Sequence, residues 1–152
     1  GIRATAEIAV RAGFVHILFN EPPEEDSAAI DTYLKSLRPV PSPFLVDGQL
    51  SELAQRGREL FHSDRVACHR CHPAPRYTDS RAYDVGTRTP YDRISRFDTP
   101  TLVEVWRTAP YLHDGRYTTV RDLLIEGRHG IRPSQNLTDE EIEALVEFVL
   151  SL

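Results

Sequence analysis

The sequence predicts a mainly α-helical protein, with one helical domain preceded by a helical N-terminal extension. Three observations support this fold class. Apolar residues recur at helical spacing in several short segments, whereas strand-like alternation is scarce. The chain has 152 residues, 40% of them hydrophobic, which suits one main core with an appendage. Eleven prolines and eight glycines lie between the periodic segments and favour long loops wrapped around a bound group.

The N-terminal extension is expected to contain a helix and an extended linker. Residues 22–37 predict the helix from apolar residues at helical spacing: Ala28, Ala29, Tyr33, Leu34 and Leu37. Residues 38–43, Arg-Pro-Val-Pro-Ser-Pro, cannot continue a helix and predict the linker. We therefore divide the chain into an extension with its linker, residues 1–43, and a main domain, residues 44–152.

The main domain is expected to begin with a helix that starts near Gln49 and runs toward two cysteines. Gly57 lies in the middle of its apolar face. A glycine there costs roughly 1 kcal/mol against alanine, so we expect another helix to approach closely. A loop is predicted over residues 73–97, followed by short helices at residues 100–108 and 119–127.

The last helix has the clearest signals. Thr138 and Glu141 have the spacing of a capping box. The residues that follow form a continuous apolar stripe: Ile142, Leu145, Val146, Val149 and Leu150.

Charge and composition exclude several functions. The formal charge is −5 without a basic run, which argues against binding to nucleic acid. No run of about twenty apolar residues occurs, so no membrane span is predicted. The sequence begins at Gly1 without an initiator Met, so we expect a processed or excised piece of a longer product. Two neighbouring cysteines cannot form a disulfide framework.

Residues 68–72, Cys-His-Arg-Cys-His, have the C-x-x-C-H pattern of covalent c-type haem attachment. Cys68 and Cys71 would bond the porphyrin vinyl groups and His72 would be the proximal iron ligand, because one turn brings the three side chains together. The alternatives are a zinc half-site, a redox dithiol or chance. A four-cysteine zinc site is impossible with two cysteines, and the βαβ units of thioredoxin-like proteins are absent from the pattern. One covalent haem c is therefore predicted.

The second iron ligand cannot be methionine, because the chain has none. Histidine, tyrosine, water or an open position remain. The candidate histidines outside the motif are His16, His62, His113 and His129. We favour His129 as the distal ligand, because Gly127 and Gly130 flank it in a loop just past a predicted helix. The alternative is an exposed loop histidine.

Four further segments carry a family resemblance. They are residues 76–79 (Arg-Tyr-Thr-Asp), 83–86 (Tyr-Asp-Val-Gly), 97–102 (Phe-Asp-Thr-Pro-Thr-Leu) and 108–115 (Thr-Ala-Pro-Tyr-Leu-His-Asp-Gly). In order and spacing they resemble the di-haem cytochrome c peroxidase and MauG-like superfamily, especially its C-terminal haem domain. The resemblance covers residues 49–152 and implies a cytochrome c-like helical domain around one covalent haem.

The resemblance also implies roles for individual residues. Cys68 and Cys71 would hold the haem, with His72 proximal, and His129 would replace the Met or Tyr that is the distal ligand in the family. His113 would organise a loop near the haem. The carbonyls of Thr108 and Pro110 match positions that bind calcium between two haem domains, although the second domain that completes such a site is not evident in the sequence.

The expected function is one-electron transfer through a bis-His haem, in a periplasmic or extracellular location. A single C-x-x-C-H disfavours peroxide reduction by this chain alone, since that reaction requires an open haem and a second haem to supply electrons. The expected partners are redox proteins or another haem domain, and an oligomer is compatible with the sequence. The rival hypothesis is a peroxidase or MauG-like catalytic domain with an open or displaceable sixth ligand. A haem-based sensor is a third possibility.

A short internal repeat connects the extension with the main domain. Residues 5–13 and 119–127 have equal lengths, each runs from Thr to Gly, and each is followed closely by a histidine, His16 or His129. An acidic helix start follows in both cases. The repeat predicts that residues 1–37 complete a preceding haem domain with His16 as a ligand of another haem. The alternative is a packing helix with an exposed His16. Trp106 is expected to pack in the core, with an electron-conduit role as the alternative.

Overall fold

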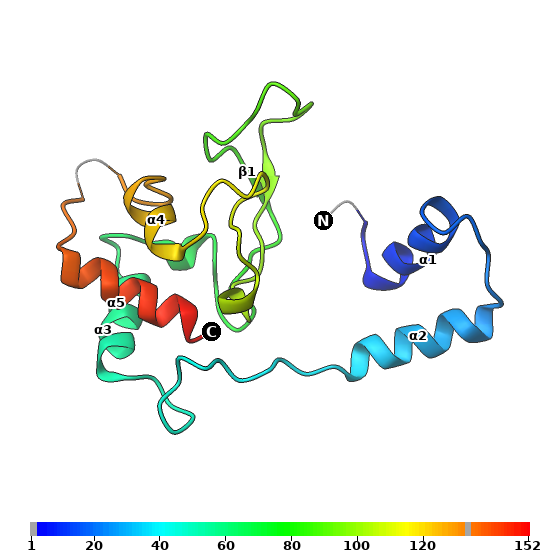
Figure 1. Ribbon diagram of the computed structural model, residues 1–152, viewed down its shortest axis with the longest axis horizontal. Helices are drawn as coiled ribbons and strands as arrows, with labels where there is room; N and C mark the ends of the chain where they lie inside the picture. Colours follow the sequence, from blue (N-terminus) through cyan, green and yellow to red (C-terminus); the bar gives the residue numbers. More distant parts are fainter. Residues whose placement is uncertain (1–2, 133–134) are drawn as a thin grey trace. The chain divides into compact units, whose positions relative to one another are not determined.

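The computed structural model describes residues 3–132 and 135–152, and the chain forms two compact units that meet at the Pro39–Val40 bond (Figure 1). Helices dominate both units, and the described residues contain one two-stranded sheet. The predicted mainly α fold is confirmed. None of the described helices is both long enough and apolar enough to cross a membrane.

The first unit is a pair of helices, α1 (Ala6–His16) and α2 (Glu24–Ser36). The Thr5 hydroxyl caps α1 by accepting a hydrogen bond from the Ile8 backbone N–H at 3.3 Å. Three ion pairs join the two helices: Arg11–Glu24 at 2.5 Å, Arg11–Asp31 at 2.7 Å and Lys35–Glu7 at 2.6 Å. No residue of α1 is buried, so charge pairing contributes more than a core to this unit.

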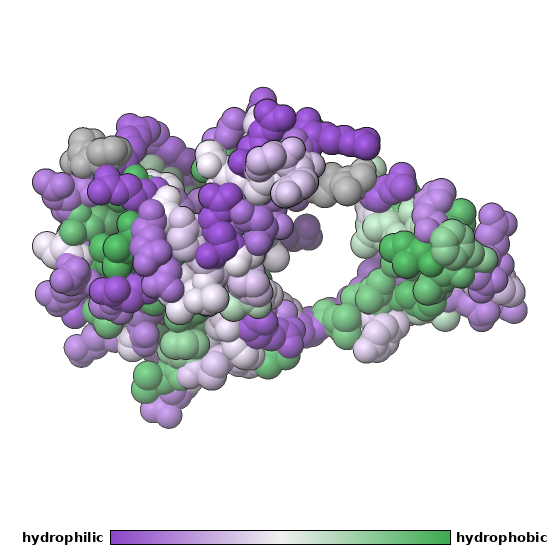
Figure 2. All heavy atoms as spheres, turned by 45° about the horizontal axis from the view of Figure 1, so that its top comes forward, coloured by the Kyte–Doolittle hydropathy of each residue, from purple (hydrophilic) through white to green (hydrophobic). Residues whose placement is uncertain are grey.

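The same unit exposes many large apolar side chains. Phe19 is 87% exposed and Ile17 is 73% exposed in the segment between the helices, and Tyr33 of α2 and Leu37 just after α2 are exposed as well. Figure 2 shows the hydrophobic surface gathered over this pair of helices. An exposed apolar surface of this kind usually marks a site of contact with another molecule.

The second unit is built on the packing of α3 (Glu52–His62) against α5 (Asp139–Leu150), which lie side by side in Figure 1. Ser51 caps α3, and Thr138 with Glu141 forms the predicted capping box of α5. The rings of Phe61 and Phe148 meet edge to face at 5.2 Å. The buried core cluster consists of Ala54, Phe61, Val105, Val120, Leu124, Leu145, Phe148 and Val149.

Gly57 lies where the two helices come closest. A Cβ atom at this position would lie 1.8 Å from the carbonyl oxygen of Ala144 and 2.9 Å from the Cβ of Phe148. Backbone atoms cannot yield to such a clash as a flexible side chain can. The close helix approach that the sequence predicted at Gly57 is confirmed.

Short elements complete the second unit. They are the 3₁₀ turn η1 (Cys68–Arg70), strands β1 (Ala82–Tyr83) and β2 (Phe97–Asp98), the 3₁₀ turn η2 (Val105–Arg107), and α4 (Val120–Ile125). The strands pair antiparallel, with Ala82 opposite Asp98 and Tyr83 opposite Phe97. Helix α4 falls within the predicted residues 119–127, and the Thr119 hydroxyl caps it by accepting from the Asp122 N–H.

The helix expected over residues 100–108 is wrong. Only the turn η2 forms there, because Glu104 adopts a positive φ of 63° and its N–H donates to the carbonyl of Leu152 at 2.9 Å. Neither feature is compatible with a continuous α-helix. The strands β1 and β2 within and beside the predicted loop were not expected, since two-residue strands leave no alternating pattern.

The second half of the proline-rich linker belongs to the second unit. The Val40 N–H donates to Glu104 Oε1 at 2.7 Å, and the buried Ser42 hydroxyl donates to the Leu150 carbonyl at 2.6 Å. These bonds fix the linker to η2 and the end of α5. The units consequently divide after Pro39 and not after Pro43.

Gly57→Ala is expected to destabilise the second unit by about 1–3 kcal/mol, because the added methyl forces α3 and α5 apart. Urea unfolding followed by circular dichroism measures the loss. Gly13→Ala is the matched control, since nothing lies within 4 Å of a Cβ at that helical position. It should be neutral or stabilising by up to about 1 kcal/mol. Equal stability of the Gly57 variant and the wild type would contradict the packing described above.

Candidate functional site

The cysteines and His72 come together in one tight turn after α3. Ala67 adopts a left-handed conformation with φ 54°, which starts the 3₁₀ turn η1. The N–H of Cys71 and the N–H of His72 both donate to the Cys68 carbonyl, at 3.2 and 3.0 Å. The turn therefore places the three side chains of the C-x-x-C-H motif within one short segment, as c-type attachment requires.

Both cysteines are free thiols in a partly buried setting. Burial raises the pKa of Cys68 to about 11. Burial also raises the pKa of Cys71, helped by the charge of Asp79 and opposed by a hydrogen bond with Tyr83. Thiols with raised pKa values stay protonated near neutral pH, whereas a redox dithiol depends on a thiolate with a lowered pKa. This environment disfavours the redox dithiol that the sequence left open.

His72 is held as a neutral imidazole with one nitrogen available. The ring is 9% exposed, and burial lowers its pKa against the opposing effects of the Tyr77 carbonyl, the Asp79 charge and the Pro100 carbonyl. Its Nδ1 lies 2.9 Å from the Tyr77 carbonyl oxygen, which can only accept, so Nδ1 carries the proton. The Nε2 atom then carries the lone pair that could bind a metal, and histidine ligands commonly donate their other ring N–H to a carbonyl in this way.

His129 lies in the loop that follows α4. The His129 N–H donates to the Leu123 carbonyl at 3.3 Å, and Arg128 and Gly130 on either side adopt positive φ values of 47° and 70°. Burial lowers the pKa of His129, and proximity to His72 lowers it further. The ring centroids of His72 and His129 are 6.4 Å apart. The structure thus brings together the proximal and distal residues that the sequence suggested.

The spacing of the two rings suits a metal ion between them. An imidazole nitrogen binds a metal at roughly 2 Å, and the ring centroid lies about 1 Å further away. Two imidazoles on opposite sides of one ion therefore have centroids roughly 6 Å apart. The observed 6.4 Å agrees with this value. Within the described residues no group of three or more metal-ligating side chains occurs, and a haem iron takes at most two protein ligands.

Trp106 supplies a second observation that suits a haem. Its indole Nε1 is buried, and no hydrogen-bond acceptor serves it among residues 3–132 and 135–152. A buried donor without an acceptor is costly, so such a group calls for a partner. The propionate carboxylates of a haem are hydrogen-bond acceptors, which Trp106 Nε1 lacks. The sequence gave no sign of this unsatisfied donor.

The other candidate histidines have different surroundings. His113 uses both ring nitrogens, Nδ1 with the Thr87 hydroxyl at 3.3 Å and Nε2 with Asp92 at 3.0 Å, and stacks on Phe97 at 3.6 Å. These contacts give it a structural role in the loop between β1 and β2. His62 is exposed at the end of α3 with Nδ1 near the Arg58 carbonyl. His16 belongs to the first unit, in the last turn of α1, and is exposed.

A tyrosine and an aspartate near the motif escaped the sequence analysis. The Tyr83 hydroxyl donates to Asp79 Oδ2 at 2.7 Å, and the Asp79 N–H donates to the Cys71 carbonyl at 3.1 Å. The hydrogen bond from Tyr83 is the main cause that lowers the pKa of Asp79. These contacts join β1 to the attachment motif. Only the resemblance had pointed to this segment, and it gave the two side chains no role.

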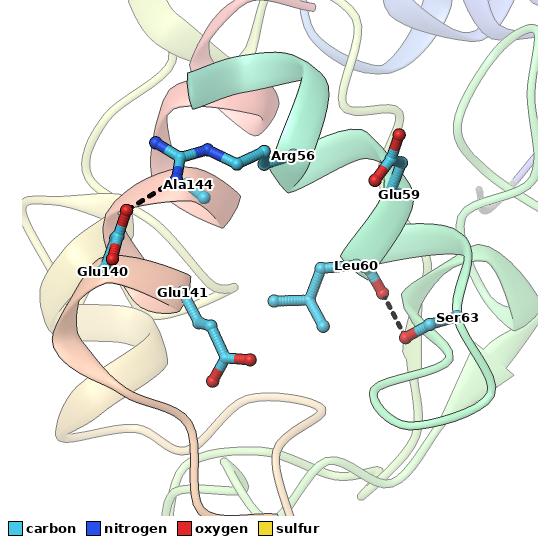
Figure 3. Close-up of a pocket in the computed structure, with 7 residues that line it drawn as sticks. All are labelled: Arg56, Glu59, Leu60, Ser63, Glu140, Glu141 and Ala144. Carbon is cyan, nitrogen blue, oxygen red and sulfur yellow. Dashed lines mark hydrogen bonds and ion pairs between the residues drawn. The ribbon is translucent and has the colours of Figure 1, made fainter. Parts of the chain in front are cut away.

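A separate groove lies between α3 and α5 (Figure 3). Charged side chains border it, and Arg56 pairs with Glu140 across it at 2.6 Å. Leu60 and Ala144 contribute its apolar part. The groove contains none of the cysteines and neither His72 nor His129, so it is not part of the candidate site.

Comparisons with known proteins identify related sequences. No family model matches the chain. It is 29% identical to hydrazine synthase subunit gamma of Kuenenia stuttgartiensis, over 92% of this chain and 52% of the relative. It is 27% identical to a cytochrome-c peroxidase of Denitromonas iodatirespirans, over 68% of this chain and 41% of the relative. The chain spans about half the length of these curated relatives.

Solved structures show the same fold. Hydrazine synthase of Kuenenia stuttgartiensis matches with a TM-score of 0.77 and 24% identity, over 95% of this chain and 60% of that one. A MauG-like protein associated with microbial copper homeostasis matches with a TM-score of 0.61 and 22% identity, over 83% of this chain and 55% of that one. One relative is named a cytochrome-c peroxidase and one solved structure a MauG-like protein, so the resemblance identified in the sequence is confirmed.

Proposed function

Since the chain resembles the di-haem cytochrome c peroxidase and MauG-like superfamily, we propose that its second unit is a c-type cytochrome domain that transfers single electrons. Cys68 and Cys71 would hold one haem covalently, His72 would be the proximal ligand and His129 the distal ligand. The observation that carries the proposal is the 6.4 Å spacing of the two imidazole rings beside the C-x-x-C-H turn. A bound haem supplies one-electron exchange at its iron.

The protein's own groups favour electron transfer over reaction with a substrate. With His72 and His129 both as ligands, a haem iron would be closed to exogenous ligands, and burial lowers the pKa of both rings so that each stays neutral and able to bind. The Tyr77 carbonyl accepts from His72 Nδ1 and raises the basicity of Nε2. Two nitrogen donors stabilise ferric iron more than a His/Met pair does, which lowers the reduction potential.

One relative supports a second candidate function. The similarity to a cytochrome-c peroxidase favours a catalytic domain in which His129 leaves the iron and opens the sixth position. Arg128 and Gly130, on either side of His129, both have positive φ values. The position of the His129 side chain therefore depends on the backbone conformation of two neighbouring residues. The experiment on His129 below separates the two functions.

The location and partners follow from the same proposal. A c-type cytochrome related to these proteins would work in the periplasm or outside the cell, with redox partner proteins or another haem domain. One relative is itself named as the subunit of an enzyme, which favours assembly with other chains. The calcium site expected at Thr108 and Pro110 would need such a second domain.

We further propose that the first unit completes a second haem domain. Thr5 caps α1 as Thr119 caps α4, and in each case an acidic helix follows after a loop. Helix α5 is covered by α3, whereas Tyr33, Leu34 and Leu37 at the end of α2 are exposed. In the proposed second haem domain, these exposed side chains would pack against the first helix and the C-x-x-C-H motif of that domain. One difference is that His16 ends α1, whereas His129 lies beyond α4.

Replacing Cys68 and Cys71 together by alanine is expected to abolish covalent haem, because no thiol remains to bond the vinyl groups. Intact mass and the pyridine haemochrome spectrum measure the attachment. His69→Ala is the control, since this side chain lies inside the motif without an attachment role and should keep covalent haem. Covalent haem in the double variant would disprove the proposed attachment.

His129→Ala is expected to convert a low-spin ferric iron to high spin and to open it to cyanide, because the distal nitrogen is lost. Absorption and electron paramagnetic resonance spectra report the change. His62→Ala removes an exposed histidine from the same unit and should leave the spectrum unchanged. A wild-type protein that is already high spin would favour the catalytic alternative, and a spin change with His113→Ala would show that the ligand was misassigned.

The proposal for the first unit predicts that the full gene product carries a second C-x-x-C-H before Gly1 and two covalent haems by intact mass. His16→Ala in that product should alter the ligation of one haem and spare the other. The corresponding control is His62→Ala. A longer product with only the motif at residues 68–72 would refute a second haem domain.

A further inference from the structure

The loop between β1 and β2, residues 84–96, projects from the second unit and has no part in the site described above (Figure 1). We call it the hairpin loop. Most hairpin connections have roughly two to five residues, and much longer ones are usually functional. The hairpin loop far exceeds that length.

The hairpin loop exposes large apolar side chains to solvent. Tyr91 is 95% exposed and Ile94 is 62% exposed, and Val85 is exposed as well. Tyrosine offers a large contact area at a low cost in conformational entropy, and it is enriched among the residues that dominate protein interfaces. The three side chains provide the apolar part of a contact surface.

The charge around these side chains is positive, although the whole chain has a formal charge of −5. The hairpin loop, residues 84–96, contains three arginines and two aspartates. Arg88 and Arg93 are exposed, and neither forms an ion pair with any residue in the described part of the chain. On α5, by contrast, arginines of other segments pair with three acidic residues, Glu140, Glu141 and Glu143. An acidic partner is therefore attracted to the arginines of the hairpin loop that form no ion pair.

Hydrogen bonds fix the hairpin loop in one conformation. Asp92 accepts from the N–H and the hydroxyl of Thr89, each at 2.7 Å, and from His113. These hydrogen bonds, chiefly those from Thr89, lower the pKa of Asp92 to about 2. The carboxylate is therefore ionised and already paired with these donors. Arg116 donates to the Thr87 carbonyl at 2.8 Å. A surface held in this way loses little conformational entropy on binding.

The base of the hairpin loop adjoins the haem-attachment motif. Tyr83 of β1 bonds to Asp79, and Asp79 bonds to the backbone of Cys71. A protein bound to the hairpin loop consequently lies on the side of the unit that contains the attachment cysteine. Electron transfer requires this kind of proximity between the partner and the cofactor.

We propose that the hairpin loop is the docking surface for an acidic electron-transfer protein. Arg88 and Arg93 pair with carboxylates of that protein, and Tyr91 and Ile94 fill an apolar depression between them. The proposal rests on the proposed electron-transfer function of the second unit. In the docked complex, one electron leaves the reduced centre of the partner and reduces ferric iron to ferrous iron.

The test uses the mature haem-loaded protein and reduced plant-type [2Fe–2S] ferredoxin, a strongly acidic one-electron donor, as the probe. Stopped-flow absorbance gives the second-order rate of haem reduction over a range of ionic strength. For the wild type the rate should fall steeply as salt is added. The double variant Arg88→Glu/Arg93→Glu should react about tenfold more slowly or worse at low salt. Tyr91→Ser should slow the reaction while keeping its salt dependence.

Two controls make the result specific. Arg38→Glu/Arg3→Glu makes the same change in net charge in the first unit and should react like the wild type. Hexaammineruthenium(II), a cationic reductant, should reduce the Arg88→Glu/Arg93→Glu variant at least as fast as the wild type. Equal ferredoxin rates for the two double variants would overturn the docking proposal. If dithionite fails to reduce even the wild-type haem, the electron-transfer function itself is wrong.

Discussion

The second unit depends on the contact of two backbones at Gly57, because that contact brings together the rings on which Tyr77 packs, and the Tyr77 carbonyl holds His72. With no side chain at Gly57, α3 lies directly against the Ala144 carbonyl. Phe61 and Phe148 then meet, and Tyr77 packs on both rings at 6.0 and 6.1 Å. Tyr77 is also the residue whose carbonyl orients His72. A disturbance at the helix contact therefore reaches His72 through three aromatic rings.

His129, the proposed distal ligand, is attached to the same core by a different route. Val120 and Leu124 bury α4 against the core cluster, and the loop leaves the helix at Gly127. A Cβ at Gly127 would lie 2.6 Å from the Leu123 carbonyl and 2.8 Å from the Tyr117 ring, so this turn also requires glycine. His129 follows two residues later. The packing of α4 and the turn at Gly127 thus place His129 with its ring centroid 6.4 Å from that of His72.

Sequence reasoning succeeded where the signal is local. The cap residues of α5, the scarcity of strands and the role of Gly57 all follow from a few neighbouring residues. It failed at Glu104, because the N–H of Glu104 donates to the carbonyl of Leu152. Leu152 is far away in the sequence, so no local pattern indicates this bond. The pairing of β1 with β2 and the unsatisfied donor of Trp106 are tertiary facts of the same kind. The facing of His72 and His129 could be suggested only by a motif, a missing methionine and a resemblance.

The two units differ in what stabilises them, and the difference bears on the function of the first. Surface ion pairs such as Arg11–Glu24 each contribute roughly 0–1 kcal/mol, and short isolated helices are marginal in water. The pair α1–α2 buries no residue of α1 and exposes Phe19 and Tyr33. A surface outside the pair that covers these side chains would therefore stabilise it. Helix α3 provides that cover for α5, so the covering surface expected for α2 is a helix of the same type, which is what the first helix of a second haem domain would supply.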